Sequence, residues 1–229
     1  MPRIAWKLLA DLGHEVRTPM TGVLGMSELL LDGPLRPQQR SQVEAIRQAG
    51  EHLLRLVDDV LDLARIGEDG LRIDARPFDV RQLVAGVAAL HAPVARARGL
   101  AFRSSVSPDL PRLVLGDATR LRQVLFNLLG NAAKFTRQGE IGVRASPGAG
   151  GNGLRLVVHD TGPGLDPARQ ARLFGRFAQG DAGLACGGSG LGLAISRELV
   201  RAMGGAIAVD GAPGAGARFV VELPFPPVR

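Results

Sequence analysis

The first 66 residues are patterned as two amphipathic helices, and this pattern limits the possible folds more than any other feature of the chain. Large apolar side chains recur in the first stretch at spacings of three and four, so they share one face of a helix. They are Leu9, Leu12, Val16, Met20, Val23, Leu24, Leu30 and Leu31. The sequence Asp32-Gly33-Pro34 ends this helix, and Pro37 opens a second one that we expect over about residues 38–65.

The second helix carries an apolar stripe of its own. Its members are Val43, Ile46, Leu53, Leu54, Val57, Val60, Leu61 and Ala64. Both stripes are wider than the seam between two helices requires, and a lone hairpin of this size cannot bury them. Two hairpins from two chains are therefore expected to pair into a four-helix bundle, which predicts a homodimer.

From Gly67 onward the pattern changes to strands that alternate with helices. We expect strands near residues 71–75, 100–106, 112–115, 140–145, 154–160, 205–210 and 217–223. We expect helices near residues 79–97, 117–135, 167–177 and 190–203. The turn-rich residues 146–153 predict an antiparallel hairpin between the strands on either side. The predicted fold class is α+β: a helical hairpin over residues 1–66, then an α/β sandwich over residues 67–229.

Composition and charge exclude several other classes. The net charge of +6 comes from Arg side chains spread singly along the chain, so we expect no nucleic-acid binding. No apolar run approaches the roughly 18 residues that span a bilayer, and the first residues lack the charged, apolar and small-residue regions typical of a signal peptide. The single cysteine, Cys186, excludes an internal disulfide. We therefore expect a cytoplasmic fragment, whose full-length protein reaches a membrane only through segments outside this chain.

A histidine on the first helix is the first candidate for chemistry. Helical geometry places His14 and Thr18 one turn apart on the solvent side, opposite the apolar stripe. An exposed imidazole can act as a nucleophile, and the neighbouring Glu15 carboxylate can favour the proton on one ring nitrogen. Pro19 removes a helical amide, so a bend is expected beside the histidine. Taken alone, such a histidine is more often an ordinary surface residue.

Two asparagines near the end of a later helix form a second candidate. Asn127 and Asn131 are four residues apart and share a helix face, where their amide oxygens could meet Mg²⁺ beside a triphosphate. Lys134 lies one turn on, and its ammonium could balance phosphate charge. By itself, this spacing also fits ordinary amides on a helix surface.

Two glycine-containing segments complete the set. Asp160 follows an apolar strand, where its carboxylate could accept a hydrogen bond from the amine of adenine, and Gly162 and Gly164 let the backbone approach the ring. A simple turn is the alternative. The loop Gly187-Gly188-Ser189-Gly190-Leu191-Gly192-Leu193 leads into a helix, whose first amides could cradle phosphate. It is neither a Walker loop nor a Rossmann turn.

Taken in order, these segments resemble the H, N, G1, F and G2 boxes of the sensor histidine kinases of two-component signalling, and most closely the hybrid type. The segments are residues 14–19, 127–136, 160–164, 173–177 and 188–192. The resemblance covers essentially the whole chain. It implies a dimerisation hairpin followed by an ATP-binding domain of the Bergerat type, which gyrase, Hsp90 and MutL proteins share.

The resemblance also implies a role for each matched residue. His14 would be the phosphoacceptor, Glu15 its acid/base partner, and Thr18 the residue that positions water when a phosphorylated response regulator is dephosphorylated. The ATP site, with Mg²⁺ on Asn131 and Asn127, would comprise Asn127, Asn131, Lys134, Asp160, Gly162, Gly164, Phe174, Phe177, Gly188, Gly190, Leu191 and Gly192. The phosphoryl group would pass from His14 to an aspartate of a receiver domain.

The resemblance implies a mobile lid anchored by Phe174 and Phe177. Between Phe177 and Gly187 this lid is about two residues shorter than in similar hybrid kinases, and it lacks the Arg and the aromatic residue that they often carry there. Gly13 stands where a serine commonly precedes the histidine, and Thr21 where an asparagine is common. The short lid leaves open a second function, a nucleotide-binding dimeric scaffold that has lost useful kinase activity.

Overall fold

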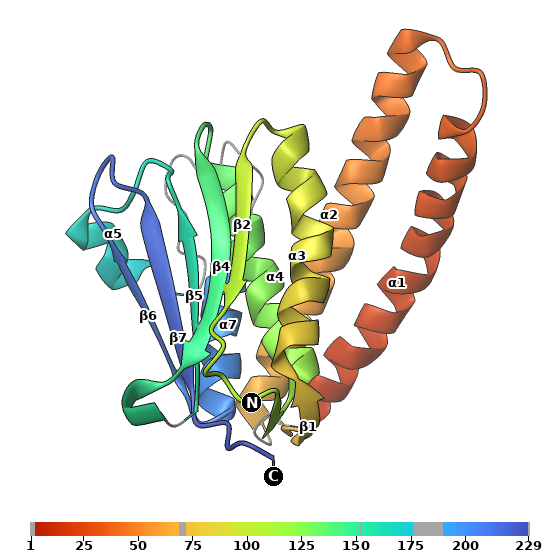
Figure 1. Cartoon of the computed structure of the whole chain (residues 1–229). Helices are drawn as coiled ribbons and strands as arrows, with labels where there is room; N and C mark the ends of the chain where they lie inside the picture. The colour runs from red at the N-terminus through yellow and green to blue at the C-terminus, as the bar shows by residue number, and fades with distance from the viewer. Residues whose placement is uncertain (1–2, 69–71, 152, 176–189, 229) are drawn as a thin grey trace. The chain divides into compact units, whose positions relative to one another are not determined.

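The computed structural model describes residues 3–68, 72–151, 153–175 and 190–228 (Figure 1). The chain divides into two compact units, Met1–Gly70 and Leu71–Arg229. The first is helical and the second is an α/β unit, so the predicted α+β class is confirmed. Among the described residues, no helix combines the length and apolarity that crossing a lipid bilayer requires.

The first unit is a hairpin of α1 (Arg3–Leu31) and α2 (Pro37–Glu68). The two helices approach closely at buried glycines. A Cβ added to Gly50 would lie 2.9 Å from Cε of Met20, and one added to Gly13 would overlap the side chain of Leu61. Helix α1 continues through Pro19. The close approach explains why small residues stand at these two positions.

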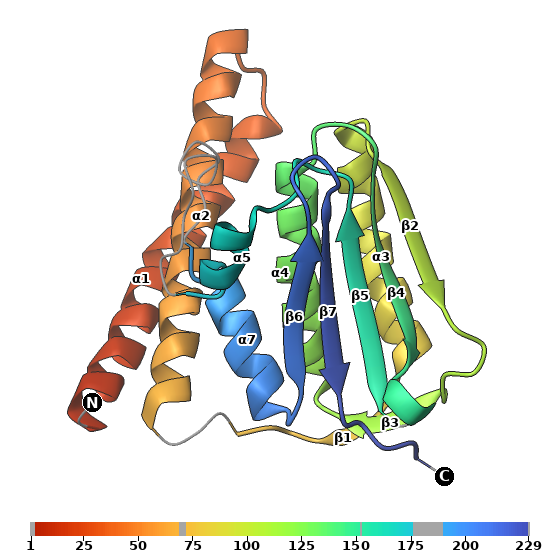
Figure 2. The same ribbon diagram turned by 90° about the vertical axis from the view of Figure 1, so that its left-hand side faces the viewer.

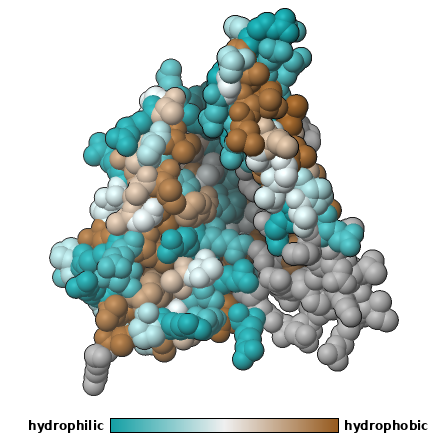
Figure 3. Space-filling model, turned by 90° about the vertical axis from the view of Figure 1, so that its right-hand side faces the viewer, coloured by the Kyte–Doolittle hydropathy of each residue, from teal (hydrophilic) through white to brown (hydrophobic). Residues whose placement is uncertain are grey.

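Apolar side chains remain on the outside of this hairpin. Met26 and Leu29 are 66% and 69% exposed on α1. On α2 the exposed apolar residues Ile46, Leu53 and Val60 follow one another at intervals of seven, which is the spacing of a coiled-coil seam. Figure 3 shows a hydrophobic band on the hairpin beside its hydrophilic tip. A single hairpin therefore leaves an apolar face without a partner.

The second unit is built on a five-stranded sheet in the order β2-β4-β5-β7-β6. The strands are β2 (Ala101–Val106), β4 (Glu140–Pro147), β5 (Leu154–Asp160), β6 (Ala206–Gly211) and β7 (Ala217–Leu223). β2 pairs with β4 in parallel, and the other pairs are antiparallel. The predicted hairpin of β4 and β5 is confirmed. A separate pair joins β1 (Arg76–Asp79) to β3 (Leu113–Gly116).

Helices pack on one face of this sheet and leave the other face uncovered by described elements (Figures 1 and 2). They are α3 (Val80–Ala97), α4 (Ala118–Phe135) and α7 (Gly192–Ala202), while the short α5 (Pro167–Arg172) follows β5. The core is largely aliphatic. Leu121, Leu125, Leu128 and Leu129 of α4 are fully buried.

Aspartate caps fix where three of these helices begin. The side chains of Asp79, Asp117 and Asp166 each accept a hydrogen bond from the amide three residues later, which satisfies one of the open N–H groups of the first turn. The helix α7 differs, because its N-cap residue Leu191 makes no side-chain capping bond. Its first amides are therefore not satisfied in this way.

The strand expected near residues 71–75 was wrong, since β1 begins at Arg76. The alternation of apolar and polar residues at 71–75 resembles a strand in the sequence, but no described strand pairs with residues 72–75. Pairing with β3 decides the position instead, with Arg76 opposite Gly116 and Asp79 opposite Leu113. The strands predicted over 154–160 and 217–223 are confirmed at both ends.

Candidate functional site

Two side-chain amides on α4 are linked to α7 through a buried serine. Asn127 donates a hydrogen bond from Nδ2 to Oγ of Ser196 at 2.8 Å, and Asn131 donates from Nδ2 to Oδ1 of Asn127 at 3.5 Å. Ser196 is 1% exposed, so its position is fixed by the packing of α7 on α4. The amide groups are thereby oriented, and Oδ1 of Asn131 is left for a ligand.

The glycine at the start of α7 allows this arrangement. A Cβ added to Gly192 would overlap the side-chain amide of Asn127. Gly190 has a φ of 69°, a left-handed conformation in which L side chains are unfavourable, and Leu191 between them is buried. The first turn of α7, for which the N-cap side chain of Leu191 provides no hydrogen bond, thus begins beside the asparagines. Amides at a helix start are a suitable environment for an anion.

Asp160 ends β5 and is held by two backbone amides. Its Oδ1 atom accepts hydrogen bonds from the amides of Gly162, at 2.8 Å, and Ala217, at 3.3 Å. Both bonds involve the same oxygen, so Oδ2 is available to a ligand. Burial raises the pKa of Asp160 above its ordinary value, although the two hydrogen bonds oppose this shift.

Gly164 shapes the loop that follows. Its φ is 71°, and a Cβ at this position would overlap the carbonyl of Ala212 in the loop between β6 and β7. The backbone therefore lies against its neighbour more closely than any other residue would permit. The glycine is required by the fold of the loop, whether or not a ligand approaches it.

The end of α4 adjoins the Asp160 turn. Thr136 follows the last residue of the helix and is only 4% exposed. Its hydroxyl lies near Gly162, since a Cβ added to that glycine would be 3.2 Å from Oγ1 of Thr136. The structure thus brings the asparagine segment and the aspartate segment together at one end of α4.

Lys134 and Phe174 lie in surroundings that the sequence did not predict. The Nζ atom of Lys134 lies 5.2 Å from the ring centre of Phe135. The ring of Phe174 packs edge-on against Phe219, with centres 6.5 Å apart, and the guanidinium of Arg197 lies 5.9 Å from its centre. Phe174 is therefore anchored to the sheet unit. The predicted site residues Phe177 and Gly188 lie outside the described residues.

The phosphoacceptor candidates lie on α1. His14 is within the helix. Thr18 is exposed, as expected for the side opposite the apolar stripe, and Glu15 is exposed as well. Gly13 directly precedes the histidine and is buried against Leu61 of α2. Close packing on one side of the helix therefore lies next to the predicted reactive position.

The side-chain amide oxygens of Asn127 and Asn131 suit a hard cation such as Mg²⁺ only together with further oxygen ligands. Amide oxygens are acceptable ligands for Mg²⁺, which usually keeps several waters and takes further oxygens from substrate phosphates. Within the described residues no three His, Cys, Asp or Glu side chains gather to hold a metal ion. The residues present fit Mg²⁺ bound together with a nucleotide.

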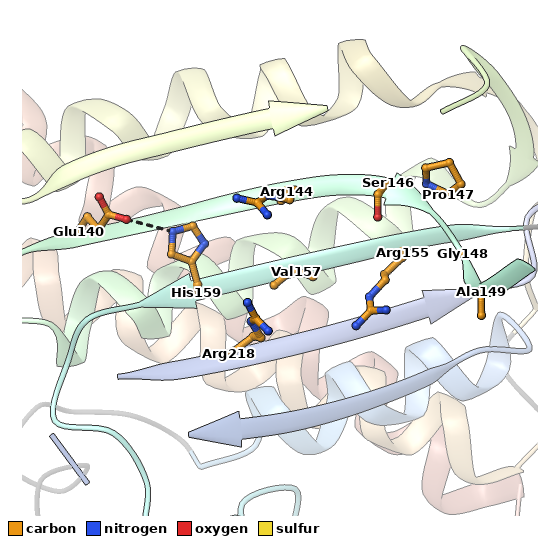
Figure 4. Close-up of a pocket in the computed structure, with 10 residues that line it drawn as sticks. All are labelled: Glu140, Arg144, Ser146, Pro147, Gly148, Ala149, Arg155, Val157, His159 and Arg218. Carbon is orange, nitrogen blue, oxygen red and sulfur yellow. Dashed lines mark ion pairs between the residues drawn. The ribbon is translucent and has the colours of Figure 1, made fainter. Parts of the chain in front are cut away.

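Away from these residues, a hollow lies on the uncovered face of the sheet (Figure 4). It encloses about 530 Å³ and is lined by charged residues of β4, β5 and β7, among them Arg144, Arg155 and Arg218. Glu140 at its margin is bonded to Arg103 at 2.6 Å, which lowers the pKa of Glu140. None of the predicted site residues lines this hollow, so it is separate from the asparagine and aspartate cluster.

Sequence reasoning missed three groups in the cluster: Ser196, Thr136 and the amide of Ala217. One signal was present for Ser196, because it is the polar residue on the buried face of α7, beside Ala194, Ile195, Leu199 and Val200. Thr136 and Ala217 gave no signal of their own. Their roles depend on which segments the fold brings together.

Two known protein families match the chain, one in each of its two units. Residues 7–69 match the His Kinase A (phospho-acceptor) domain, and residues 116–227 match the histidine kinase-, DNA gyrase B- and HSP90-like ATPase domain. The sensor protein GacS of Pseudomonas syringae pv. syringae is 40% identical over 99% of this chain, which covers 26% of that protein. The chain spans about a quarter of the length of the curated relatives it matches.

Solved structures give the same result. Full-length ShkA in complex with AMPPNP is 45% identical, with a TM-score of 0.81 over 97% of this chain and 46% of that one. The mycobacterial sensor histidine kinase MprB is 31% identical, with a TM-score of 0.55 over 67% of this chain and 99% of that one.

Proposed function

The chain belongs to the histidine kinases, and from this premise we propose that it is an ATP-dependent protein-histidine kinase core that phosphorylates its own His14. The observation that carries the proposal is the occurrence, in one chain, of a phosphoacceptor-type hairpin and a domain whose two asparagines are oriented beside the start of α7. The first part supplies the nucleophile and the second supplies the nucleotide site.

The phosphoryl transfer itself requires a nucleophile and a base. A ring nitrogen of His14 would attack the γ-phosphorus of ATP, and the bond from that phosphorus to the bridging oxygen would break, so that ADP leaves. The ring proton would pass to Glu15, the exposed residue that follows His14 in α1. The products are phosphohistidine and ADP. Positioning and charge neutralisation supply most of the rate in reactions of this kind.

The nucleotide would be recognised at both of its ends. Oδ2 of Asp160 would accept a hydrogen bond from the adenine amine, beside Gly162 and Gly164. The asparagines, Lys134 and the amides of Gly190, Leu191 and Gly192 would surround the phosphates. Mg²⁺ bound by Asn131 and Asn127 would neutralise phosphate charge. Phe174 would anchor the lid whose other predicted members, Phe177 and Gly188, lie outside the described residues.

We further propose that the phosphoryl group passes to an aspartate of a response-regulator receiver domain, in the same protein or in another. Thr18 would orient the water that later hydrolyses the aspartyl phosphate. The unit of function would be a homodimer formed through the hairpin. The exposed apolar residues of α1 and α2, including the interval of seven on α2, support this association.

Incubation with radiolabelled ATP and Mg²⁺ tests the kinase proposal. The expected result is an acid-labile label on the wild-type chain that is absent from His14→Gln. The matched variant His52→Gln changes the same residue type on α2 and should keep the label. Binding of nucleotide with no label on any chain would instead support the scaffold function.

A further inference from the structure

The hydroxyl of Thr136 is a buried polar group without a hydrogen-bond partner. The backbone of this residue is fixed, since its amide donates to the carbonyl of Ala132 at 3.1 Å and ends α4. The residue is 4% exposed, and no described residue bonds to its Oγ1 atom. Buried polar groups in folded proteins are nearly always paired, so an unpaired one at the edge of a ligand site points to a ligand.

The space in front of this hydroxyl is shared with Asp160. A Cβ added to Gly162 would lie 2.9 Å from Oδ1 of Asp160 and 3.2 Å from Oγ1 of Thr136. Because residue 162 is a glycine, that space stays open between the two side chains. A carboxylate from the end of β5 and a hydroxyl from the end of α4 therefore border one small volume.

The neighbouring donors are already engaged. The amides of Gly162 and Ala217 both donate to Oδ1 of Asp160. The hydroxyl of Thr161 accepts from the amide of Glu140 at 2.9 Å and lies 3.2 Å from the carbonyl of Gln138, to which it donates. An ionised carboxylate can only accept. Among these described groups around Gly162, the hydroxyl of Thr136 is the donor that remains.

We propose that Thr136 is a second base-recognition residue, whose hydroxyl donates a hydrogen bond to ring nitrogen N1 of adenine. This inference rests on the proposed function, because it takes adenine as the ligand of Asp160. Adenine presents the donor 6-amine and the acceptor N1 side by side, which matches an acceptor from Asp160 and a donor from Thr136. Guanine presents an acceptor and a donor in the reverse order, so the same pair of residues disfavours it.

Binding of ADP and of 1-deaza-ADP, which lacks the N1 acceptor, tests this on the whole chain by calorimetry. Thr136→Val removes the hydroxyl and keeps the shape. We expect it to weaken ADP binding about 3- to 10-fold, as loss of one hydrogen bond does, and to leave 1-deaza-ADP binding unchanged. Thr136→Ser keeps a hydroxyl and should restore ADP binding. Thr119→Val makes the same change at an exposed position of α4 and should bind both ligands like the wild type.

The thermal midpoint without ligand separates recognition from a structural role. Because the hydroxyl has no partner in the protein, Thr136→Val should unfold at the wild-type temperature or above it. A lower midpoint, or an equal loss of ADP and 1-deaza-ADP binding, would overturn the inference and leave the proposed function intact. If Thr136→Val binds ADP as tightly as the wild type does, the inference is overturned as well. Failure of the wild-type chain to bind ADP would instead overturn the proposed nucleotide site together with this inference.

Discussion

The side-chain amide of Asn127 donates a 2.8 Å hydrogen bond to the buried hydroxyl of Ser196, and this bond joins α4 to α7. It fixes which way the amide faces, because the nitrogen is occupied by the serine and the oxygen faces Asn131. The orientation of the proposed metal-binding amides therefore depends on a residue that is not itself a proposed ligand of nucleotide or metal.

We expect Ser196→Ala to weaken Mg²⁺-dependent ATP binding about 3- to 10-fold, because Asn127 loses the bond that orients it. The free energy of unfolding should fall by about 1 kcal/mol. Calorimetric titration with and without Mg²⁺ measures the first effect, and denaturant unfolding the second. Ser105→Ala, an exposed serine of β2, serves as the control. Equal ATP binding by both variants would contradict the positioning role.

Gly192→Ala should reduce ATP affinity by ~10-fold or more, since the added methyl group overlaps the amide of Asn127 and must displace it. Gly86→Ala makes the same change in α3, where nothing lies within 4 Å of the new atom. This control should bind ATP normally and gain roughly 0.5–1 kcal/mol of stability from better helix propensity. If the two variants bind ATP with equal affinity, the contact between Gly192 and Asn127 does not contribute to ATP binding.

Asp160→Asn should stabilise the unliganded domain and impair ATP binding. The folded state raises the pKa of this carboxyl, so between its ordinary pKa and the raised one the folded chain binds more protons than the unfolded chain. The free energy of unfolding contributed by Asp160 therefore falls as pH rises through this interval. The amide variant does not titrate, and its thermal midpoint should exceed that of the wild type near pH 7 but match it near pH 4.

The same variant separates stability from recognition. If its oxygen keeps the bonds to the amides of Gly162 and Ala217, its NH₂ group replaces Oδ2 and meets the adenine amine with a second donor. ATP affinity should therefore fall about 10-fold or more. An unchanged affinity would exclude Asp160 as the acceptor for the base.

Thr18→Ala should keep autophosphorylation of His14 within a few-fold of the wild type, yet slow dephosphorylation of a partner receiver by ~10-fold or more. The threonine is exposed on α1, one turn from the histidine, where its hydroxyl could orient water without holding the imidazole. Decay of the labelled receiver, followed with each kinase, provides the measurement. Parallel decay curves would exclude the phosphatase role.

Dimerisation should depend on the hairpin alone. Met26→Glu combined with Leu29→Glu places two charges on the exposed apolar face of α1, and light scattering should then report a monomer. Val94→Glu, at an exposed apolar position of α3, should leave the dimer intact. Residues 67–229 alone should be monomeric. A dimer of that fragment would place the interface outside the hairpin.

The elements that could be predicted from the sequence are those whose pattern is local. The strand over residues 154–160 alternates between buried leucine or valine and outward-facing side chains, and its ends were predicted without error. The first strand was misplaced because its position depends on β3, more than 30 residues away. Local periodicity contains no information on such a pairing.

The same distinction applies to the candidate site. Asn127 and Asn131 were predicted as site residues from their residue type and their spacing of four, and Asp160 from its position directly after an apolar strand. Ser196 is 69 residues from Asn127, and its importance appears only when α7 packs on α4. Gly192 was expected to let phosphate approach the backbone amides at the start of α7. The structure adds that the absence of a side chain there makes room for the side-chain amide of Asn127.

The position of β7 has a consequence for synthesis on the ribosome. This strand is the last of the five in sequence but lies inside the sheet, between β5 and the edge strand β6. The five-stranded sheet therefore cannot be completed until residues 217–223 have emerged from the ribosome. The hairpin of α1 and α2 can form without them. The nascent chain accordingly presents a finished hairpin, with its apolar face open to another nascent chain, while the nucleotide domain is still incomplete.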